Sequence, residues 1–189
     1  MIALLSTLTG AFVAYLLGVR SSSIGRRAAY IERQLSEFYS PLAAYLMRIK
    51  AKSELRLRIA KLADQTWEEI EQIEKPFHDH KEHFFTSHQK QIEYDWQQFR
   101  EELFPLYRKM LEIFTEKYWL ADPDTRQYYQ VYLEFVELWE RCLSESIPEK
   151  VRRKIQYDQD KLNLFFDHIE ERMEKLRREL KDEKFFRYR

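Results

Sequence analysis

Four of the five histidines gather within eleven consecutive positions, and they are the residues whose types and spacing could support metal chemistry. Imidazole nitrogens and the carboxylates between them are good ligands for zinc or iron. The cluster follows Pro76, where we expect the turn between two long helices, and it lacks the zincin pattern of two histidines flanking a glutamate. A polar turn rich in titratable groups is our interpretation, and a metal site is the alternative. The histidines of this cluster are His78, His80, His83 and His88.

Other catalytic chemistries fail on spacing or on composition. Diiron carboxylate bundles use Glu-x-x-His on inward helix faces, and none of the residues three positions before a histidine is acidic. Phosphate-binding loops and nucleophile elbows need glycine, but the chain has three glycines and none follows Gly25. We therefore predict that the chain is not an enzyme and uses no cofactor.

The first nineteen residues, Met1–Val19, carry no charge and would span about 28 Å as a helix, close to the hydrocarbon thickness of a bilayer. Three arginines follow this segment and nothing basic precedes it, so the positive-inside rule places the N-terminus outside and the body in the cytoplasm. We expect a single-pass inner-membrane protein whose arginines contact the lipid surface. A cleaved signal peptide and a buried N-terminal helix are the alternatives. The arginines are Arg20, Arg26 and Arg27.

Within this anchor, small side chains recur at four-residue spacing and so form one ridge along a single helix face. Such a ridge lets two membrane helices approach closely, as in small-xxx-small pairs, which predicts self-association of the anchor. The alternative is that these residues reflect the usual composition of membrane helices. The ridge consists of Ser6, Gly10, Ala14 and Gly18.

The body after Gly25 has apolar residues in alternating steps of three and four, the pattern of helices that bury a narrow seam. Ser40 before Pro41 predicts a break or kink of the helix near Tyr39 and Ser40, and Pro105 predicts a kink in the second helix. The predicted fold is all-α, with an N-terminal transmembrane helix and an elongated antiparallel four-helix bundle or coiled-coil-like body. The expected parts are a transmembrane anchor over 1–20, a basic juxtamembrane connector over 21–40, and a bundle over 41–189 with helices over about 41–75, 87–119, 123–144 and 148–184.

Four apolar stripes define the expected core of the bundle, one on each helix. The third is aromatic, and the fourth forms a heptad seam. We expect all four to be buried between antiparallel neighbours. The stripes are Ile31, Leu35, Phe38, Leu42, Tyr45, Ile49, Leu55, Ile59, Leu62, Ile70, Ile73 and Phe77; Ile92, Trp96, Phe99, Leu103, Leu106, Met110 and Ile113; Tyr128, Tyr132, Phe135, Trp139 and Cys142; and Leu162, Phe166, Ile169, Met173, Leu176 and Leu180.

Charge is distributed unevenly although the formal net charge is zero. The basic run from Arg48 to Lys61 could bind a nucleic-acid backbone, but it lacks interleaved aromatic residues and an acidic stretch follows it. We interpret the run as a solvated face balanced by neighbouring helices, and we expect no nucleic-acid partner. Cys142 is the only cysteine, which fits a reducing compartment.

The string LSEFYSPL at Leu35–Leu42, together with the apolar segment before it, resembles a pattern of uncharacterised bacterial inner-membrane proteins. Those proteins have one N-terminal span and a cytoplasmic helical region. A loop like His83–Ser87 and a segment like Leu138–Arg141 before the last helix are similar to theirs. The resemblance implies this membrane topology and no assigned activity.

These features together predict a membrane-tethered interaction or scaffold protein that acts by oligomerisation or by binding a protein partner. One alternative is a membrane-acting effector of a phage-defence or toxin system, in which the anchor compromises the membrane. Another is a metal-dependent enzyme that uses the cluster from His78 to His88.

Overall fold

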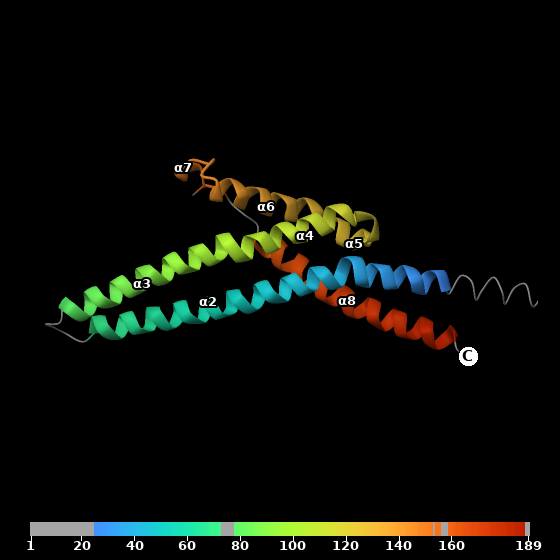
Figure 1. The fold of residues 1–189 in the computed structure, drawn as a ribbon, viewed down its shortest axis with the longest axis horizontal. Coiled ribbons are helices and arrows are strands. Elements are labelled where there is room, and N and C mark those ends of the chain that lie inside the picture. Colours follow the sequence, from blue (N-terminus) through green and yellow to red (C-terminus); the bar gives the residue numbers. More distant parts are fainter. Residues whose placement is uncertain (1–24, 73–77, 153, 156–158, 188–189) are drawn as a thin grey trace, which may run out of the picture.

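The computed structural model describes residues 25–72, 78–152, 154–155 and 159–187, and these residues form helices and turns without any strand. The predicted all-α class is therefore confirmed, with four long helical stretches in the described part of the chain (Figure 1). None of the described helices is long and apolar enough to cross a membrane. The predicted anchor Met1–Val19, with its ridge Ser6, Gly10, Ala14 and Gly18 and the following Arg20, lies outside the described residues.

The first helical stretch runs without a break from residue 25 to the end of α2 (Ser40–Gln72). A single π-helical turn, Leu35–Tyr39, precedes α2, and the Ser40 N–H donates to the Leu35 carbonyl. The wider π turn makes room for Pro41, which has no N–H and whose ring would crowd a regular α-helix. The predicted break before Pro41 is therefore wrong, because the proline is accommodated inside a continuous helix.

The second stretch consists of α3 (His78–Gln98), a π-helical turn over Phe99–Leu103, and α4 (Phe104–Glu116). Pro105 again follows the π turn by two residues, as Pro41 does in the first stretch. The stretch begins well before the expected start at residue 87, so the histidine cluster lies in a helix and the predicted turn there is wrong. Acidic residues in its first turns are favoured by the helix dipole, which is consistent with the early start.

The third stretch is interrupted near its beginning. A 3-10 turn over Tyr118–Leu120 leads to the short helix α5 (Pro123–Arg126), and α6 (Tyr129–Leu143) follows. Pro123 stands at the first helical position, where its missing N–H is not needed.

α6 ends in a Schellman motif that is built without glycine. The Ser146 N–H donates to the Arg141 carbonyl at 3.0 Å, and the Glu145 N–H donates to the Cys142 carbonyl at 3.3 Å. Glu145 takes the left-handed conformation, with a φ of 54°. The left-handed conformation costs a residue with a Cβ roughly 1 kcal/mol, so this motif is less stable than one with glycine at the same position.

The predicted last helix over 148–184 is wrong in its N-terminal part. α7 (Glu149–Arg152) is a single turn, Ile155 is not helical, and α8 (Gln159–Arg187) is the long final helix. Val151 is 49% exposed and Ile155 38%, so the segment has little contact with the core. A helical turn without such support is unstable, because nucleation fixes several residues for one hydrogen bond.

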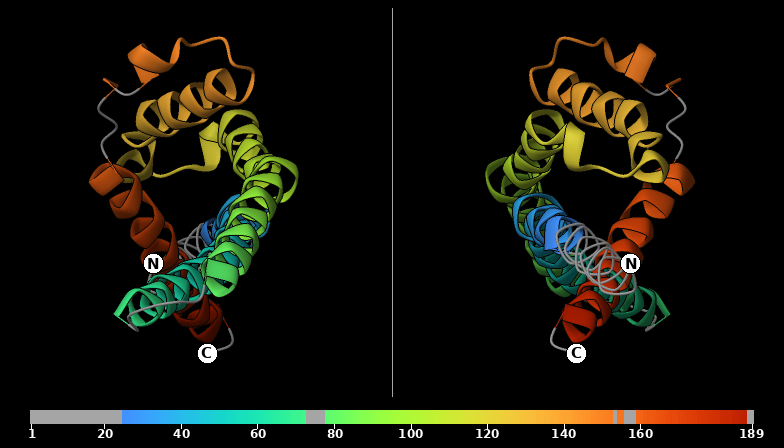
Figure 2. Two further views of the ribbon diagram at one scale, coloured as in Figure 1. Left: turned by 90° about the vertical axis from the view of Figure 1, so that its left-hand side faces the viewer. Right: turned by 90° about the vertical axis from the view of Figure 1, so that its right-hand side faces the viewer.

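The core lies where the N-terminal half of the first stretch, α4, α6 and α8 meet. Figure 2, viewed along the long axis, shows α6 over α4 and α8 crossing α2. Phe38, Phe114 and Phe165 are fully buried, and the rings of Phe114 and Phe165 stack with centroids 5.7 Å apart. The seam of α8 is buried from Leu162 to Leu176, and Leu180 packs against the core, as expected.

The distal part of the α2 and α3 pair, residues 51–72 and 78–98, forms an arm that extends beyond α6 and α8 (Figure 1). None of its residues whose side chains are described is buried. The prediction that the first two stripes continue as core along this arm is therefore wrong. The physical reason is that α6 and α8 cover little of this helix pair, so its large apolar side chains remain accessible to solvent. The exposed apolar residues are Leu55, Leu57, Ile59, Leu62, Phe85, Ile92, Tyr94 and Trp96.

Candidate functional site

A polar network centred on Asp122 joins the first helical stretch, the turn before α5, and α8. The Tyr39 hydroxyl donates to Asp122 Oδ2 at 3.0 Å, and Gln34 Nε2 donates to Asp122 Oδ1 at 3.1 Å. Arg172 of α8 donates from Nε to the same carboxylate and from Nη1 to Glu179 at 3.1 Å. Three segments far apart in the sequence are therefore tied to one ionised carboxylate.

The network continues from Tyr39 towards a histidine of α8. The Tyr39 hydroxyl lies 2.7 Å from Thr125 Oγ1, which lies 2.8 Å from His168 Nε2. The Asp122 backbone N–H also donates to the Tyr39 hydroxyl at 3.2 Å. The two buried hydroxyl groups, of Tyr39 and Thr125, thus both have hydrogen-bond partners, as buried polar groups require.

Burial and charge shift three titration equilibria in the network. Burial raises the pKa of Tyr39 to about 12. Partial burial alone would raise the pKa of Asp122, but hydrogen bonds from Arg172, Gln34 and Tyr39 outweigh it and hold this pKa below its usual range. Burial lowers the pKa of His168, against the opposing effect of the nearby carboxylates. At neutral pH, Tyr39 and His168 are therefore neutral and Asp122 is ionised.

The geometry suits a structural clamp rather than a catalytic centre. Tyr39 and Thr125 are fully buried, so their hydroxyls cannot reach a substrate. Sequence reasoning missed the network, because Asp122 looks like an ordinary helix start and His168 is the one histidine outside the cluster. The only signal in the sequence is that His168 and Arg172 stand four residues apart on one face of α8.

The histidine cluster occupies the first three turns of α3. Of its members, only His88 has a described side chain, and it is half-buried beside α2. The side chains of His78, His80 and His83 lie outside what the structure describes. Within the described residues, no group of three or more histidine, cysteine, aspartate or glutamate side chains is placed to hold a metal ion.

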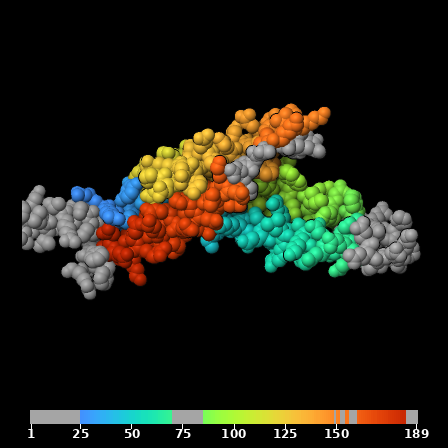
Figure 3. Space-filling view, turned by 180° about the vertical axis from the view of Figure 1, so that it is seen from behind, coloured from blue at the N-terminus to red at the C-terminus, as the bar shows by residue number. Residues whose placement is uncertain are grey.

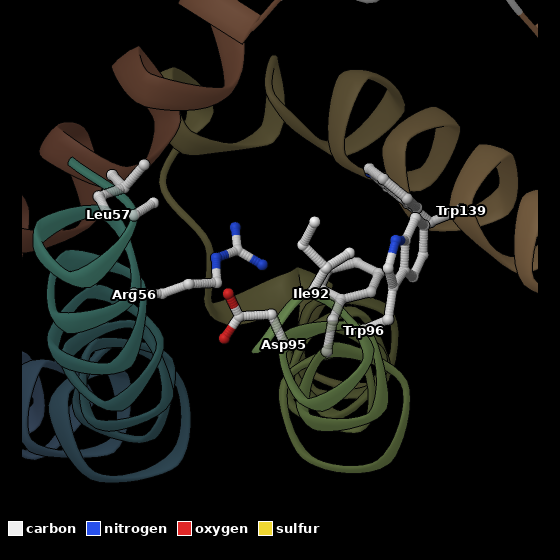
Figure 4. A pocket seen from close by; sticks show the side chains of 8 residues that line it. Arg56, Leu57, Ile92, Asp95, Trp96 and Trp139 are labelled. Atoms are coloured by element: carbon white, nitrogen blue, oxygen red, sulfur yellow. The ribbon is translucent and has the colours of Figure 1, made fainter. Parts of the chain in front are cut away.

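An apolar pocket of about 270 Å³ opens where the arm meets α6. Its aromatic wall is well packed, with the Phe99 and Trp139 ring centroids 4.7 Å apart and those of Trp96 and Trp139 6.5 Å apart. Figure 4 shows the Arg56 and Asp95 side chains pointing toward one another from α2 and α3. The pocket therefore combines a large apolar surface with one cation and one anion. Its lining residues are Arg56, Leu57, Ala60, Ile92, Asp95, Trp96, Phe99 and Trp139.

A second pocket, of about 200 Å³, lies farther out along the arm. Trp67 of α2 and Phe85 of α3 line it, together with Ala63, Asp64 and His88. Both pockets lie at the boundary between α2 and α3. We refer to the two pockets together as the arm groove. This groove is wide enough for apolar side chains of another helix, which is a common mode of recognition between helical proteins.

A separate apolar surface runs along the outside of α2. Its residues recur in steps of three and four, and all of them are exposed, Met47 and Leu62 at 65% and 57%. With about 100° between successive residues, this surface lies roughly 140° around α2 from Ala60 and Ala63, which line the groove beside α3. We refer to it as the outer stripe. It consists of Ala44, Met47, Ala51, Leu55, Ile59 and Leu62.

Two of the three predicted membrane-surface arginines are described. Arg26 and Arg27 are exposed near the start of the first helical stretch, and Arg27 pairs with Glu183 of α8 at 3.2 Å. Arg26 is therefore exposed to solvent, whereas Arg27 is shared with the end of α8.

Comparisons of the chain with protein-family models, with curated proteins and with solved structures gave no match.

Proposed function

We propose that this chain is a membrane-tethered helical interaction protein that acts through oligomerisation or partner binding on its arm. The observation that carries the proposal is the amount of exposed apolar surface on the arm. Eight large apolar side chains of the arm are exposed, of which four line the groove and three lie on the outer stripe. Exposed apolar surface of this extent is typical of protein contacts, because burying it on association is favourable.

The placement of the arm is consistent with this role. Residue 25 and the end of α8 lie at one end of the molecule, and the arm lies at the other (Figure 1). If Met1–Val19 anchors the chain and Arg20, Arg26 and Arg27 meet the cytoplasmic surface of the inner membrane, the arm stays clear of its own anchor. A partner could then reach both the groove and the outer stripe.

The test is the mass of the full chain in detergent micelles, measured by light scattering after size-exclusion chromatography. One variant carries Leu55→Gln with Leu62→Gln on the outer stripe, and a second carries Ile92→Gln with Trp96→Gln beside the groove. We expect at least one pair to convert an oligomer into a monomer without changing the helical content. The matched controls are Leu133→Gln on α6 and Leu164→Gln on α8, which are equally apolar and 39% and 57% exposed outside the arm.

The controls should retain the mass of the unmodified chain. If the arm variants and the controls all retain the same oligomeric mass, the arm does not mediate association and the proposal is wrong. A monomeric unmodified chain at all concentrations would also contradict the oligomerisation proposed here.

A further inference from the structure

We infer that the outer stripe of α2 binds the same stripe of a second copy of this chain, with the two α2 helices antiparallel. The inference rests on the proposed function and identifies the partner of the outer stripe. Its starting point is the length of the stripe. Apolar or small side chains recur from Ala44 to Leu62, over about 27 Å of helix at 1.5 Å per residue.

The composition of the stripe suits close packing of two helices. Ala44 and Ala51 are small and exposed, so they would let a second helix approach, while Met47, Leu55 and Leu62 would supply apolar area. α3 lies on another side of α2 and cannot cover the stripe. In Figure 3, α2 runs along the lower margin of the arm, below α3.

The charges of α2 decide the direction of the pairing. Residues 48–61 hold six basic residues and one acidic residue, a net of +5, whereas residues 64–72 hold four acidic residues and no basic residue, a net of −4. Two parallel α2 helices would place like charges side by side along their whole length. Two antiparallel helices can place the start of the basic run of each copy, residues 48–53, beside the acidic residues within 64–69 of the other, which is favourable.

An antiparallel pair centred between Arg58 and Ile59 brings together the Leu55–Leu62 part of the two stripes and places residues 48–52 of each copy beside residues 65–69 of the other. In this register, Leu55 of one copy lies opposite Leu62 of the second copy. Arg48 lies opposite Glu69, and both of these side chains are exposed. The two-fold symmetry repeats each contact, as an isologous interface requires.

The expected affinity of this contact is modest. A single helix–helix contact of this length falls near or below the lower end of stable interfaces, about 1,200 Å² in total. Tethering to one membrane would raise the effective concentration of the two copies and compensate for the small area. The antiparallel pair places the two residue-25 ends far apart, so the anchor ridge could join each copy to a different neighbour. Two distinct contacts of this kind generate an extended assembly, which suits a scaffold.

Disulfide cross-linking of the full chain in detergent micelles tests the direction directly. In a background with Cys142→Ser, three variants are made: Arg48→Cys, Glu69→Cys and Ile59→Cys. Antiparallel pairing predicts a covalent dimer for Ile59→Cys alone. It also predicts a covalent dimer for the mixture of Arg48→Cys and Glu69→Cys, at a yield at least fivefold above either variant by itself. Leu133→Cys on α6 is the control for random collision.

A charge exchange gives an independent measurement. Arg48→Glu and Glu69→Arg should each weaken dimerisation about two- to fivefold, the range of an exposed ion pair, and the combination should restore it. The control exchange uses Arg177 and Glu174 of α8, which form an ion pair remote from the stripe. It should leave dimerisation unchanged.

Three results would overturn the inference. Efficient cross-linking of Arg48→Cys to itself would show parallel helices. Yields no higher than that of Leu133→Cys at all three positions, in a chain that is still oligomeric, would show that another surface associates. In that case the proposed function survives and the stripe contact does not. A chain that is monomeric throughout would overturn both.

Discussion

The clamp around Asp122 predicts a specific loss of stability when Arg172 is replaced by leucine. The substitution keeps most of the apolar volume but leaves Asp122 ionised with only Gln34 and Tyr39 as side-chain donors. Breaking a fully buried ion pair costs about 3–5 kcal/mol, and breaking an exposed pair costs about 0–1 kcal/mol. The Arg172 and Asp122 side chains are 18% and 22% exposed, so an intermediate cost is expected. We predict that Arg172→Leu lowers the free energy of unfolding by about 2–3 kcal/mol.

The assay is thermal unfolding of the full chain in detergent, followed by circular dichroism. For a body of this size, about 2–4 °C of melting temperature corresponds to 1 kcal/mol, so Arg172→Leu should melt about 4–12 °C lower. Arg177→Leu is the matched control, because Arg177 also pairs with a glutamate on α8 but is 52% exposed. It should change the melting temperature by less than about 3 °C.

A double-mutant cycle separates the ion pair from general packing. Asp122→Asn combined with Arg172→Leu should be less destabilising than the sum of the two single substitutions by at least about 1 kcal/mol, because the two groups act on each other. If Arg172→Leu is no more destabilising than Arg177→Leu, or if the two effects are additive, the clamp does not hold the three segments together as described.

Three further predictions test other features of the chain. Glu145→Gly should raise the free energy of unfolding by about 0.5–1 kcal/mol in a melting experiment, because glycine adopts the left-handed φ at the end of α6 without strain; an unchanged or lower value would contradict this. Burial lowers the pKa of His168 in the folded state below its ordinary value near 6.5. The charge of Arg172 lowers this pKa further, while the carboxylates of Asp124, Glu171 and Asp122 raise it and only partly offset the effect of burial. The histidine therefore binds its proton more readily in the unfolded state, so stability should fall as pH drops from 6.5 through the lower folded pKa. His168→Gln should flatten that part of a pH–melting curve, and an equally steep curve would count against it. Gly10→Ile with Gly18→Ile should weaken association of the anchor in a membrane by removing close helix contact, as measured by energy transfer between labelled chains, whereas Ile2→Leu should not.

Much of the secondary structure could be predicted from the sequence, because apolar periodicity reports directly which face of a helix is buried. The predicted seam of α8 is core, and of the predicted aromatic stripe Tyr132 and Phe135 are buried while Tyr128 and Trp139 pack against the core from its edge. The predicted break before Pro41 is wrong for a physical reason. A π turn can absorb Pro41 or Pro105 without ending the helix, and no residue type marks such a turn in advance.

The arm and the clamp could not be predicted, because each depends on which elements meet in space. Periodicity alone cannot show that Leu55 and Leu62 remain exposed although they continue the apolar pattern of the core. Similarly, Tyr39, Asp122 and His168 are brought together only by the crossing of α8 over the first stretch. Long-range polar contacts of this kind leave no periodic signal in a single sequence.

The central claim is that the outward apolar side chains of the arm serve association and do not stabilise the fold. Sedimentation equilibrium of the full chain in detergent tests this directly when it is combined with the melting temperature of the same samples. The variant carries Leu55→Gln, Leu62→Gln, Phe85→Gln and Ile92→Gln together, and it leaves the contact between Trp96 and Trp139 in place. We predict that its association is at least about tenfold weaker, equivalent to about 1.4 kcal/mol, while it melts at the temperature of the monomeric unmodified chain. Unchanged association, or a clearly lower melting temperature of the monomer, would contradict the account.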